Sequence, residues 1–255
     1  MAYDDKSISG IDLFIVCLLG IAIIYCKSGA YTPICFSYLL IPAKKFANKK
    51  EYTTFVSGLG ITYILAFLAK NIKVVNTGAE VTNKVMGIET AMSVPNYSVG
   101  YLLQNPVTLF DVMNNTIADK TDFYIQSMFG QHLGWIQIEI ANIFVIAFAL
   151  LLMLSAFRAK GEKQFVTVGN KWWIFIVTMA STILVLLGML ISWTPITYVS
   201  VEGVQGRYFF PILMLGCMLL RNSKLTFDKN ADREIMFATY MTTVLSAFCF
   251  MHVVL

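Results

Sequence analysis

The residues best suited to chemistry lie close together in the stretch WTPITYVSVEGVQGRYFFP, which covers residues 193–211. Arg207 carries a guanidinium group, which can hold a phosphate through two parallel hydrogen bonds. Glu202, five residues upstream, could pair with Arg207, bind a divalent metal, or act as an acid or base. The other residues that would line the same site are Tyr198, Gln205 and Tyr208. Together these residue types predict a site for a phosphate or pyrophosphate group.

Simpler explanations compete with this one. Arg207 could extend its side chain toward lipid headgroups or form a purely structural ion pair with Glu202. The tyrosines could serve as anchors at a membrane–water interface. For Glu202 we favour the structural explanation over catalysis, and for Arg207 both explanations stay open. Gly203 and Gly206 permit unusual backbone angles and Pro211 suits the beginning of a helix, so the stretch predicts a loop that leads into a helix.

Other polar residues are weaker candidates. His132 could act as a general base, although a histidine beside an apolar run usually has no such role, and Lys27 fits a turn between two apolar runs. The sequence contains no Walker A loop, no H-E-x-x-H, no G-x-S-x-G and no basic-aromatic nucleic-acid motif. We therefore expect no nucleic-acid partner, no metal and no cofactor, with a divalent metal at Glu202 left open as an alternative. The five cysteines lack C-x-x-C spacing and are expected to be buried hydrophobes.

The composition predicts the setting in which these residues act. Of the 255 residues, 57% are hydrophobic and only 13% are charged. A soluble domain carries about 25% charged residues, and no soluble core could absorb so much apolar sequence. The chain is therefore expected to be an all-α, multi-pass membrane protein, and neither a disordered chain nor a small disulfide scaffold.

Seven apolar runs are expected to cross the membrane as helices of one transmembrane domain that covers residues 1–255. A helix needs about 20 residues to cross a hydrocarbon core of about 30 Å. Three of the runs are shorter than that, but their backbone must still be hydrogen-bonded inside the bilayer, so we expect helices there too. The predicted spans are residues 11–25, 31–41, 52–68, 136–157, 172–193, 208–220 and 235–255.

Lysine and arginine collect in three links between the runs, and such links usually face the cytoplasm. The three sets are Lys44, Lys45, Lys49 and Lys50; Arg158, Lys160, Lys163 and Lys171; and Arg221, Lys224, Lys229 and Arg233. All three links fall on one side if every run crosses once. This arrangement predicts a cytoplasmic N-terminus, an extracytoplasmic C-terminus, and two outside segments at about residues 69–135 and 194–207.

The length of the sixth run predicts how deep Arg207 lies in the membrane. Arg207 and Arg221 bracket this run, and the fourteen steps between them span about 21 Å as a helix, which is less than the core thickness. If Arg221 sits at the cytoplasmic face, Arg207 lies below the outer headgroups unless the bilayer thins there or the side chain reaches upward. An arginine at that depth needs a partner or a watery cavity. The sequence thus predicts a loop that dips into the outer mouth of a helix bundle, where a lipid-linked phosphate would fit.

The long outside segment contains a helix signal. Asn105 can cap a helix and Pro106 suits its first position. One predicted face carries Leu109, Phe110, Met113 and Ile117, and the other carries mostly Asp111, Asn114, Asn115 and Asp119. Such a helix lies either along the outer membrane surface or against the protein's own spans. We favour packing against the protein.

Four stretches resemble a known family: KSGAYTPICFSYLLIPAKKF, YLLQNPVTLFDVMNNT, MFGQHLGW and VEGVQGRYFFP. They are similar to a bacterial multi-pass membrane family catalogued as domain of unknown function 2142, whose members resemble type-C glycosyltransferases. The resemblance implies a place in the bacterial cytoplasmic membrane and a role in cell-envelope polysaccharide or lipid-glycan assembly. It also implies, as partners, membrane lipid and a sugar carried on a polyprenyl phosphate. The residues it matches as a lipid-phosphate site are Glu202, Gln205, Gly206, Arg207 and Tyr208.

The chain also departs from this family. Full members of the family look longer than this chain, and their N-terminal half carries an acidic outside loop. In type-C enzymes such a loop is expected to hold the catalytic base. Here the first outside turn covers only residues 26–30, and no such acidic motif occurs. The chain therefore resembles the C-terminal half of the family, and a missing N-terminal half or a partner subunit would supply the base. The alternative is a non-enzymatic membrane protein: a lipid-glycan transporter, an assembly subunit or an inactive remnant.

Overall fold

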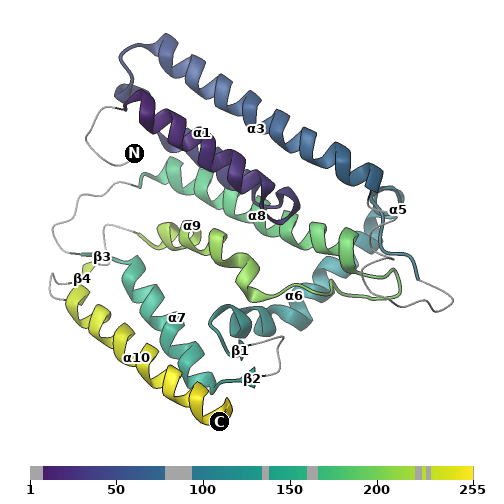
Figure 1. The fold of residues 1–255 in the computed structure, drawn as a ribbon, viewed down its shortest axis with the longest axis vertical. Coiled ribbons are helices and arrows are strands. Elements are labelled where there is room, and N and C mark those ends of the chain that lie inside the picture. Colours follow the sequence, from purple (N-terminus) through teal and green to yellow (C-terminus); the bar gives the residue numbers. More distant parts are fainter. Residues whose placement is uncertain are drawn as a thin grey trace. The chain divides into compact units, whose positions relative to one another are not determined.

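The computed structural model describes residues 8–77, 94–133, 138–159, 166–221, 226–227 and 231–254. This part of the chain is mostly helical, with two pairs of two-residue strands, which confirms the all-α expectation (Figure 1). The chain forms two compact units. One comprises Met1–Phe110 and Phe175–Gly203, and the other comprises Asp111–Ile174 and Val204–Leu255.

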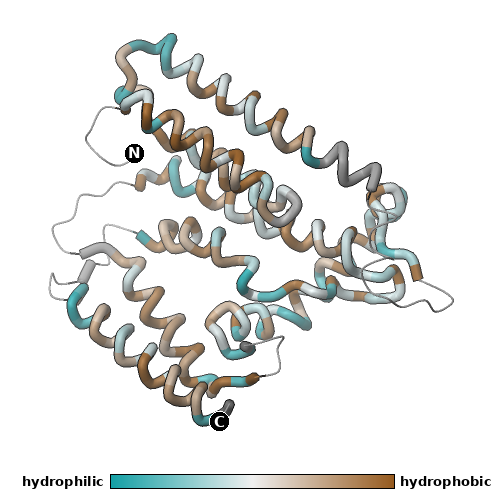
Figure 2. The backbone as a smooth tube through the Cα atoms, viewed as in Figure 1, coloured by the Kyte–Doolittle hydropathy of each residue, from teal (hydrophilic) through white to brown (hydrophobic). Residues whose placement is uncertain are grey.

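Three helices are long and apolar enough to cross a membrane: Lys49–Lys70, Val168–Trp193 and Ala231–His252. They coincide with the third, fifth and seventh predicted runs. Shorter apolar helices, Gly10–Tyr25, Asn142–Ala156 and Gly206–Leu220, coincide with the first, fourth and sixth. Figure 2 shows that hydrophobic residues are spread along the length of these helices. That all seven runs cross the membrane stays a prediction.

The first unit is built on helices α1 (Gly10–Tyr25) and α3 (Lys49–Thr77). Tyr63 of α3 donates a hydrogen bond to the carbonyl of Val16 at 2.7 Å, and Lys70 donates one to the carbonyl of Ile24 at 3.2 Å. Both sequence positions increase together, so the two helices run parallel (Figure 1). The chain between them must therefore return along their length.

The returning segment contains the second predicted run, residues 31–41, and it is not one continuous α-helix. It begins with η1 (Cys26–Gly29) and continues as α2 (Thr32–Cys35), η2 (Phe36–Leu40) and η3 (Ala43–Lys45). A 3-10 helix rises about 2.0 Å per residue, so this short run covers more length than an α-helix would. Cys35 donates to the carbonyl of Gly20 at 3.2 Å and Tyr38 to that of Val56 at 2.9 Å, so the segment lies against both helices.

Aromatic packing and one small residue let these pieces meet. The buried side chains between α1, α3 and the returning segment form a hydrophobic cluster: Ile24, Cys35, Tyr38, Ile41, Leu59 and Tyr63. The rings of Tyr38 and Tyr63 meet edge to face at 5.8 Å, a favoured geometry for aromatic pairs. A Cβ at Gly20 would overlap the ring of Tyr63, so this crossing requires a glycine.

The second unit contains α7 (Asn142–Ala156), α9 (Phe210–Leu220) and α10 (Ala231–Val254), and α7 packs against both of the others. α7 begins later than the predicted fourth run because the preceding residues form a strand. There β2 (Ile138–Glu139) pairs antiparallel with β1 (His132–Leu133).

Two of the lysine- and arginine-rich links lie side by side in the second unit. β3 (Arg158–Ala159) pairs in parallel with β4 (Thr226–Phe227), and Lys171 donates to the carbonyl of Leu219 at 2.8 Å. The two links are therefore close in space, and that they share one side of the membrane stays a prediction. Four basic residues of these links, Lys160, Lys163, Lys224 and Lys229, lie outside the described residues.

Candidate functional site

The two segments predicted to lie outside the membrane meet in the first unit, directly after α8 (Val168–Trp193). The N–H of Tyr97 donates to the carbonyl of Thr194 at 3.1 Å, and the N–H of Ile196 donates to the carbonyl of Pro95 at 3.0 Å. The Tyr97 hydroxyl also donates to the carbonyl of Tyr198 at 2.9 Å. Burial, with a smaller effect of Tyr101, raises the pKa of Tyr97. These contacts join the two predicted outside segments near the end of a candidate span.

Glu202 is held through its backbone. Its N–H donates to the hydroxyl of Thr194 at 3.0 Å, and Thr194 is fully buried. The Ser200 hydroxyl lies 3.5 Å from a Glu202 carboxylate oxygen. Gly203 has φ +74°, which confirms the predicted unusual backbone angle, and a Cβ there would come within 2.6 Å of the Trp193 ring. The backbone on both sides of the half-buried Glu202 is therefore constrained.

Gly206 is required for a different reason than the sequence predicts. It is not among the described glycines with positive φ. Instead it lies directly against helix α6 (Pro106–Met128), where a Cβ would overlap the carbonyl oxygen of Tyr124 and the backbone nitrogen of Met128. Close approach of two backbones, and not a special angle, is what excludes a side chain here.

A serine of α6 completes this contact. The N–H of Gly206 donates to the hydroxyl of Ser127 at 2.8 Å, and that hydroxyl donates to the carbonyl of Phe123 at 2.6 Å. Ser127 carries no signal in the sequence, because it lies 79 positions from Gly206 and no spacing rule connects the two residues. The rings of Tyr124 and Phe209 also meet at 5.5 Å. α6 thus holds the turn that carries Arg207.

Arg207 lies in the short helix η4 (Gly206–Phe209), which leads into α9 with Pro211 in its first turn, as predicted. Its side chain is exposed, and its guanidinium carbon lies 5.8 Å from the centre of the Tyr208 ring. Such a cation–π contact orients a guanidinium without neutralising its charge. Among the described residues the structure gives Arg207 no ion pair.

The remaining candidates are distributed as follows. Gln205 is half-buried, and its carbonyl accepts a hydrogen bond from the N–H of Tyr208 at 2.9 Å. Glu202 and Tyr198 belong to the first unit, whereas Gln205, Gly206, Arg207 and Tyr208 belong to the second. An ion pair between Glu202 and Arg207 therefore stays a prediction.

His132 has its own environment in the second unit. Its Nδ1 lies 3.6 Å from a carboxylate oxygen of Glu139, and its ring lies 5.3 Å from that of Phe123. The side chain of Lys27 lies outside the described residues. Within the described ranges, no three His, Cys, Asp or Glu side chains are grouped closely enough to hold a metal ion.

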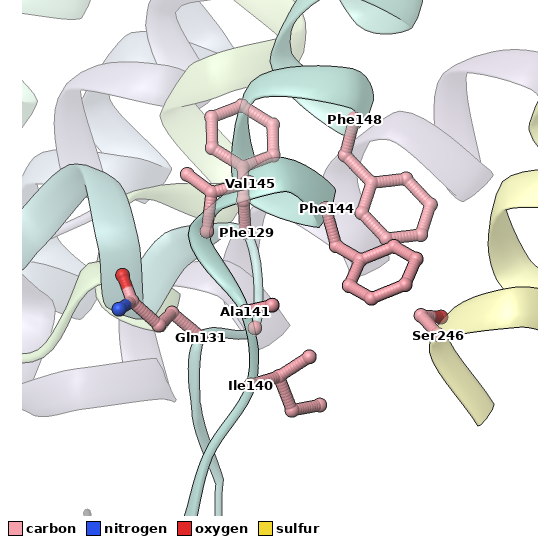
Figure 3. Close-up of a pocket in the computed structure, with 9 residues that line it drawn as sticks. Phe129, Gln131, Ile140, Ala141, Phe144, Val145, Phe148 and Ser246 are labelled. Atoms are coloured by element: carbon pink, nitrogen blue, oxygen red, sulfur yellow. The ribbon is translucent and has the colours of Figure 1, made fainter. Parts of the chain in front are cut away.

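The second unit also contains an apolar cavity of about 180 Å³. Phe144 and Phe148 of α7 line it opposite Ser246 of α10, while the amide of Gln131 points away from these rings (Figure 3). Its lining offers few polar groups, so it has the character of a packing gap and does not resemble a site for a charged ligand.

A family model described as "Predicted membrane protein (DUF2142)" matches residues 5–216. No curated protein and no solved structure matches the chain. The match covers well over half of the sequence and includes the loop with Arg207. It agrees with the apolar composition and with the three helices that are long enough to cross a bilayer. The chain therefore belongs to the family of predicted membrane proteins known as domain of unknown function 2142.

Proposed function

We propose that this membrane protein binds the phosphate group of a polyprenyl-phosphate-linked sugar through Arg207, as a step in cell-envelope glycan assembly. The observation that carries the proposal is the exposed guanidinium of Arg207, which has no ion pair among the described residues. A positive charge that no neighbouring carboxylate neutralises can take a phosphate as its counter-ion.

The position of Arg207 favours a phosphate on a lipid over a free one. Arg207 lies three residues before the apolar helix α9, whose eleven residues, Phe210–Leu220, span about 16 Å. A guanidinium at the end of such a helix lies near the boundary between hydrocarbon and water. Lipid phosphates lie at the same boundary, so a membrane-bound phosphate reaches Arg207 without leaving its leaflet.

The fixed position of the turn that carries Arg207 also supports binding. The preceding residue, Gly206, is packed against the backbone of α6 and hydrogen-bonded to Ser127. A ligand group held by a fixed turn loses less conformational entropy on binding than one on a loose loop. In this proposal Gln205 and Tyr208, the two neighbours in the turn, add hydrogen bonds to the phosphate or the sugar. Glu202 stays a predicted member of the site from the sequence.

Kinship with type-C glycosyltransferases is part of the proposal at the level of the family. The acidic outside loop expected of such enzymes does not occur in this sequence. In the proposed arrangement this chain binds the lipid-linked sugar, and another polypeptide or an N-terminal half supplies the catalytic base. The absence of the acidic motif equally favours a second candidate: a non-enzymatic protein that transports the lipid-linked glycan or assists its assembly.

The test is binding of a fluorescent polyprenyl-phosphate analogue to the purified protein in nanodiscs. Arg207→Ala is expected to weaken binding about tenfold or more, because a hydrogen bond to a charged group contributes about 1.5–3 kcal/mol. Arg207→Lys keeps the charge but not the two-pronged geometry, so it should retain part of the affinity.

Arg221→Ala is the matched control, since Arg221 follows the other end of α9. It removes the same charge and should leave binding unchanged. A polyprenol without phosphate should bind the native protein and Arg207→Ala equally. Equal binding of the phosphate analogue by the native protein and Arg207→Ala, both folded, would reduce Arg207 to a membrane anchor.

A further inference from the structure

Helix α6 divides into three faces around its axis. At 3.6 residues per turn, Val107, Phe110, Ile117 and Ile125 lie within about 80° of one another. All four side chains are exposed: Val107 by 70%, Phe110 by 71%, Ile117 by 60% and Ile125 by 43%. We call these four residues the apolar stripe. Two exposed polar residues, Asn114 and Thr121, lie in the same arc between them.

The second face is acidic and the third is buried. Asp111, Asp119 and Asp122 are exposed and lie beside the apolar stripe. Val112 and Thr116, further round the helix, are buried. Of the predicted inward face, Leu109 and Met113 are half-buried, whereas Phe110 and Ile117 are exposed, so packing against the protein uses only part of that face. The stripe and the acidic face are both left uncovered within the described chain.

The chain connects this helix to the end of a candidate membrane span. Tyr97 is hydrogen-bonded to Thr194, the residue that follows the candidate span Val168–Trp193. The short helix α5 (Val99–Gln104) begins two residues after Tyr97, and α6 follows at Pro106. Tryptophan and tyrosine near a span end mark the membrane–water interface. α6 is thus connected through a short chain to a point at that interface.

We propose that α6 lies in the membrane–water interface, with its apolar stripe among the lipid acyl chains and its acidic face in water. Lipid is the occupant that explains both exposed faces. An apolar stripe next to a charged one is the pattern by which a helix lies flat at an interface. A protein partner covering the stripe would have to bind directly beside three exposed aspartates. The inference is independent of phosphate binding by Arg207.

Neighbouring positions on α6 provide matched probes. The five native cysteines are first replaced, and single cysteines are then introduced as Phe110→Cys, Ile117→Cys, Asp111→Cys and Asp119→Cys. Each is labelled with a polarity-sensitive fluorophore, and the whole protein is reconstituted in phospholipid vesicles. Quenching is measured with nitroxide-labelled lipid and, separately, with aqueous iodide. All four side chains are exposed, so the labels should leave folding intact.

Labels at positions 110 and 117 should be quenched several-fold more by the lipid nitroxide than labels at 111 and 119, and the order should reverse with iodide. Iodide quenching of all four labels would overturn the proposal, because α6 would then lie in water. Resistance of positions 110 and 117 to both quenchers would also overturn it and would indicate cover by protein.

A second measurement needs no cysteine replacement. A photoreactive benzoylphenylalanine is placed at position 110 or at position 111 in the otherwise native chain. Irradiation in vesicles should attach phospholipid, detected by mass spectrometry, at position 110 and not at 111. Attachment of equal amounts at both positions, or attachment of a second polypeptide at 110, would contradict a lipid-facing stripe.

Discussion

The backbone N–H of Gly206 donates a hydrogen bond to the side-chain oxygen of Ser127 at 2.8 Å, between residues 79 positions apart. Ser127 is one residue before the end of α6, and Gly206 begins the turn that presents Arg207. The bond can form only because Gly206 has no side chain to keep the two backbones apart. The end of α6 and the proposed phosphate-binding turn of the second unit are therefore one structural piece.

Replacing Gly206 by alanine should destabilise the protein. The added Cβ would overlap the backbone of Tyr124 and Met128, and such overpacking costs about 1–3 kcal/mol. Thermal unfolding of the purified protein in detergent measures the effect.

Gly216→Ala, in helix α9 of the same unit, provides the control. A Cβ at Gly216 would meet nothing within 4 Å, and alanine favours a helix over glycine by about 1 kcal/mol. This variant should be neutral or slightly stabilised. Equal unfolding temperatures for the two alanine variants would show that the close approach at Gly206 has no energetic weight.

Ser127→Ala should lower stability and lipid-phosphate binding together. The substitution removes the acceptor for the N–H of the buried Gly206, and an unpaired buried group costs about 1–3 kcal/mol. The turn would then hold Arg207 less firmly, so the affinity for a polyprenyl-phosphate analogue should fall, although less than in Arg207→Ala.

Ser155→Ala is the comparison variant, since Ser155 is exposed and its hydroxyl donates to the carbonyl of Leu152 in its own helix. Both properties should stay at the native level in this variant. A loss of stability in Ser127→Ala with unchanged lipid affinity would separate the packing of the turn from ligand binding.

Cysteine labelling tests the predicted sides of the membrane. In a background without native cysteines, Asn48→Cys should resist an impermeant thiol reagent in intact cells, whereas Val94→Cys should react. Both residues are exposed. The parallel course of α1 and α3 supports the expectation, because the chain must return to its starting side before α3 begins.

Permeabilised cells show whether Asn48→Cys can react at all, and it should label there. Labelling of Asn48→Cys but not Val94→Cys in intact cells would invert the topology. Labelling of both in intact cells would show that the segment between α1 and α3 does not return across the membrane.

The first unit should lose stability at high pH through Tyr97. Burial raises the pKa of this phenol in the folded protein above its ordinary value of about 10. The stabilisation is fully present below the unfolded pKa and is lost as the pH rises through the folded one, since the unfolded chain ionises first.

Unfolding of the native protein and Tyr97→Phe, measured from about pH 8 to pH 11, checks this expectation. Tyr97→Phe should be less stable at neutral pH, because it lacks the hydrogen bond to Tyr198, but it should lose less stability as the pH rises. Tyr240→Phe, at an exposed site on α10, serves as the control and should follow the native curve. Parallel curves for the native protein and Tyr97→Phe would contradict the assigned pKa direction.

Much of the fold follows from local rules in the sequence. The apolar runs predict the helices because only internally hydrogen-bonded segments satisfy their backbone in lipid. Pro106 and Pro211 lie in the first turns of α6 and α9, where a missing N–H costs nothing. The positive φ of Gly203 is likewise predictable, since glycine adopts that angle without strain.

Other features depend on which segments meet, and only the tertiary structure decides them. The fourth run begins its helix at Asn142, because Ile138 and Glu139 pair with a strand instead. The run after α1 breaks into a short α-helix and 3-10 turns that pack on Gly20 and Val56.

The candidate site divides in the same way. That Arg207 lies just before a short apolar helix can be predicted from the sequence, because residue type and run length are local properties. Only the tertiary structure decided that Gly206 serves a backbone contact with α6 and that Phe110 and Ile117 face outward. The physical reason is that periodicity shows which side chains share a helix face, whereas the face that becomes buried depends on the shape of distant segments.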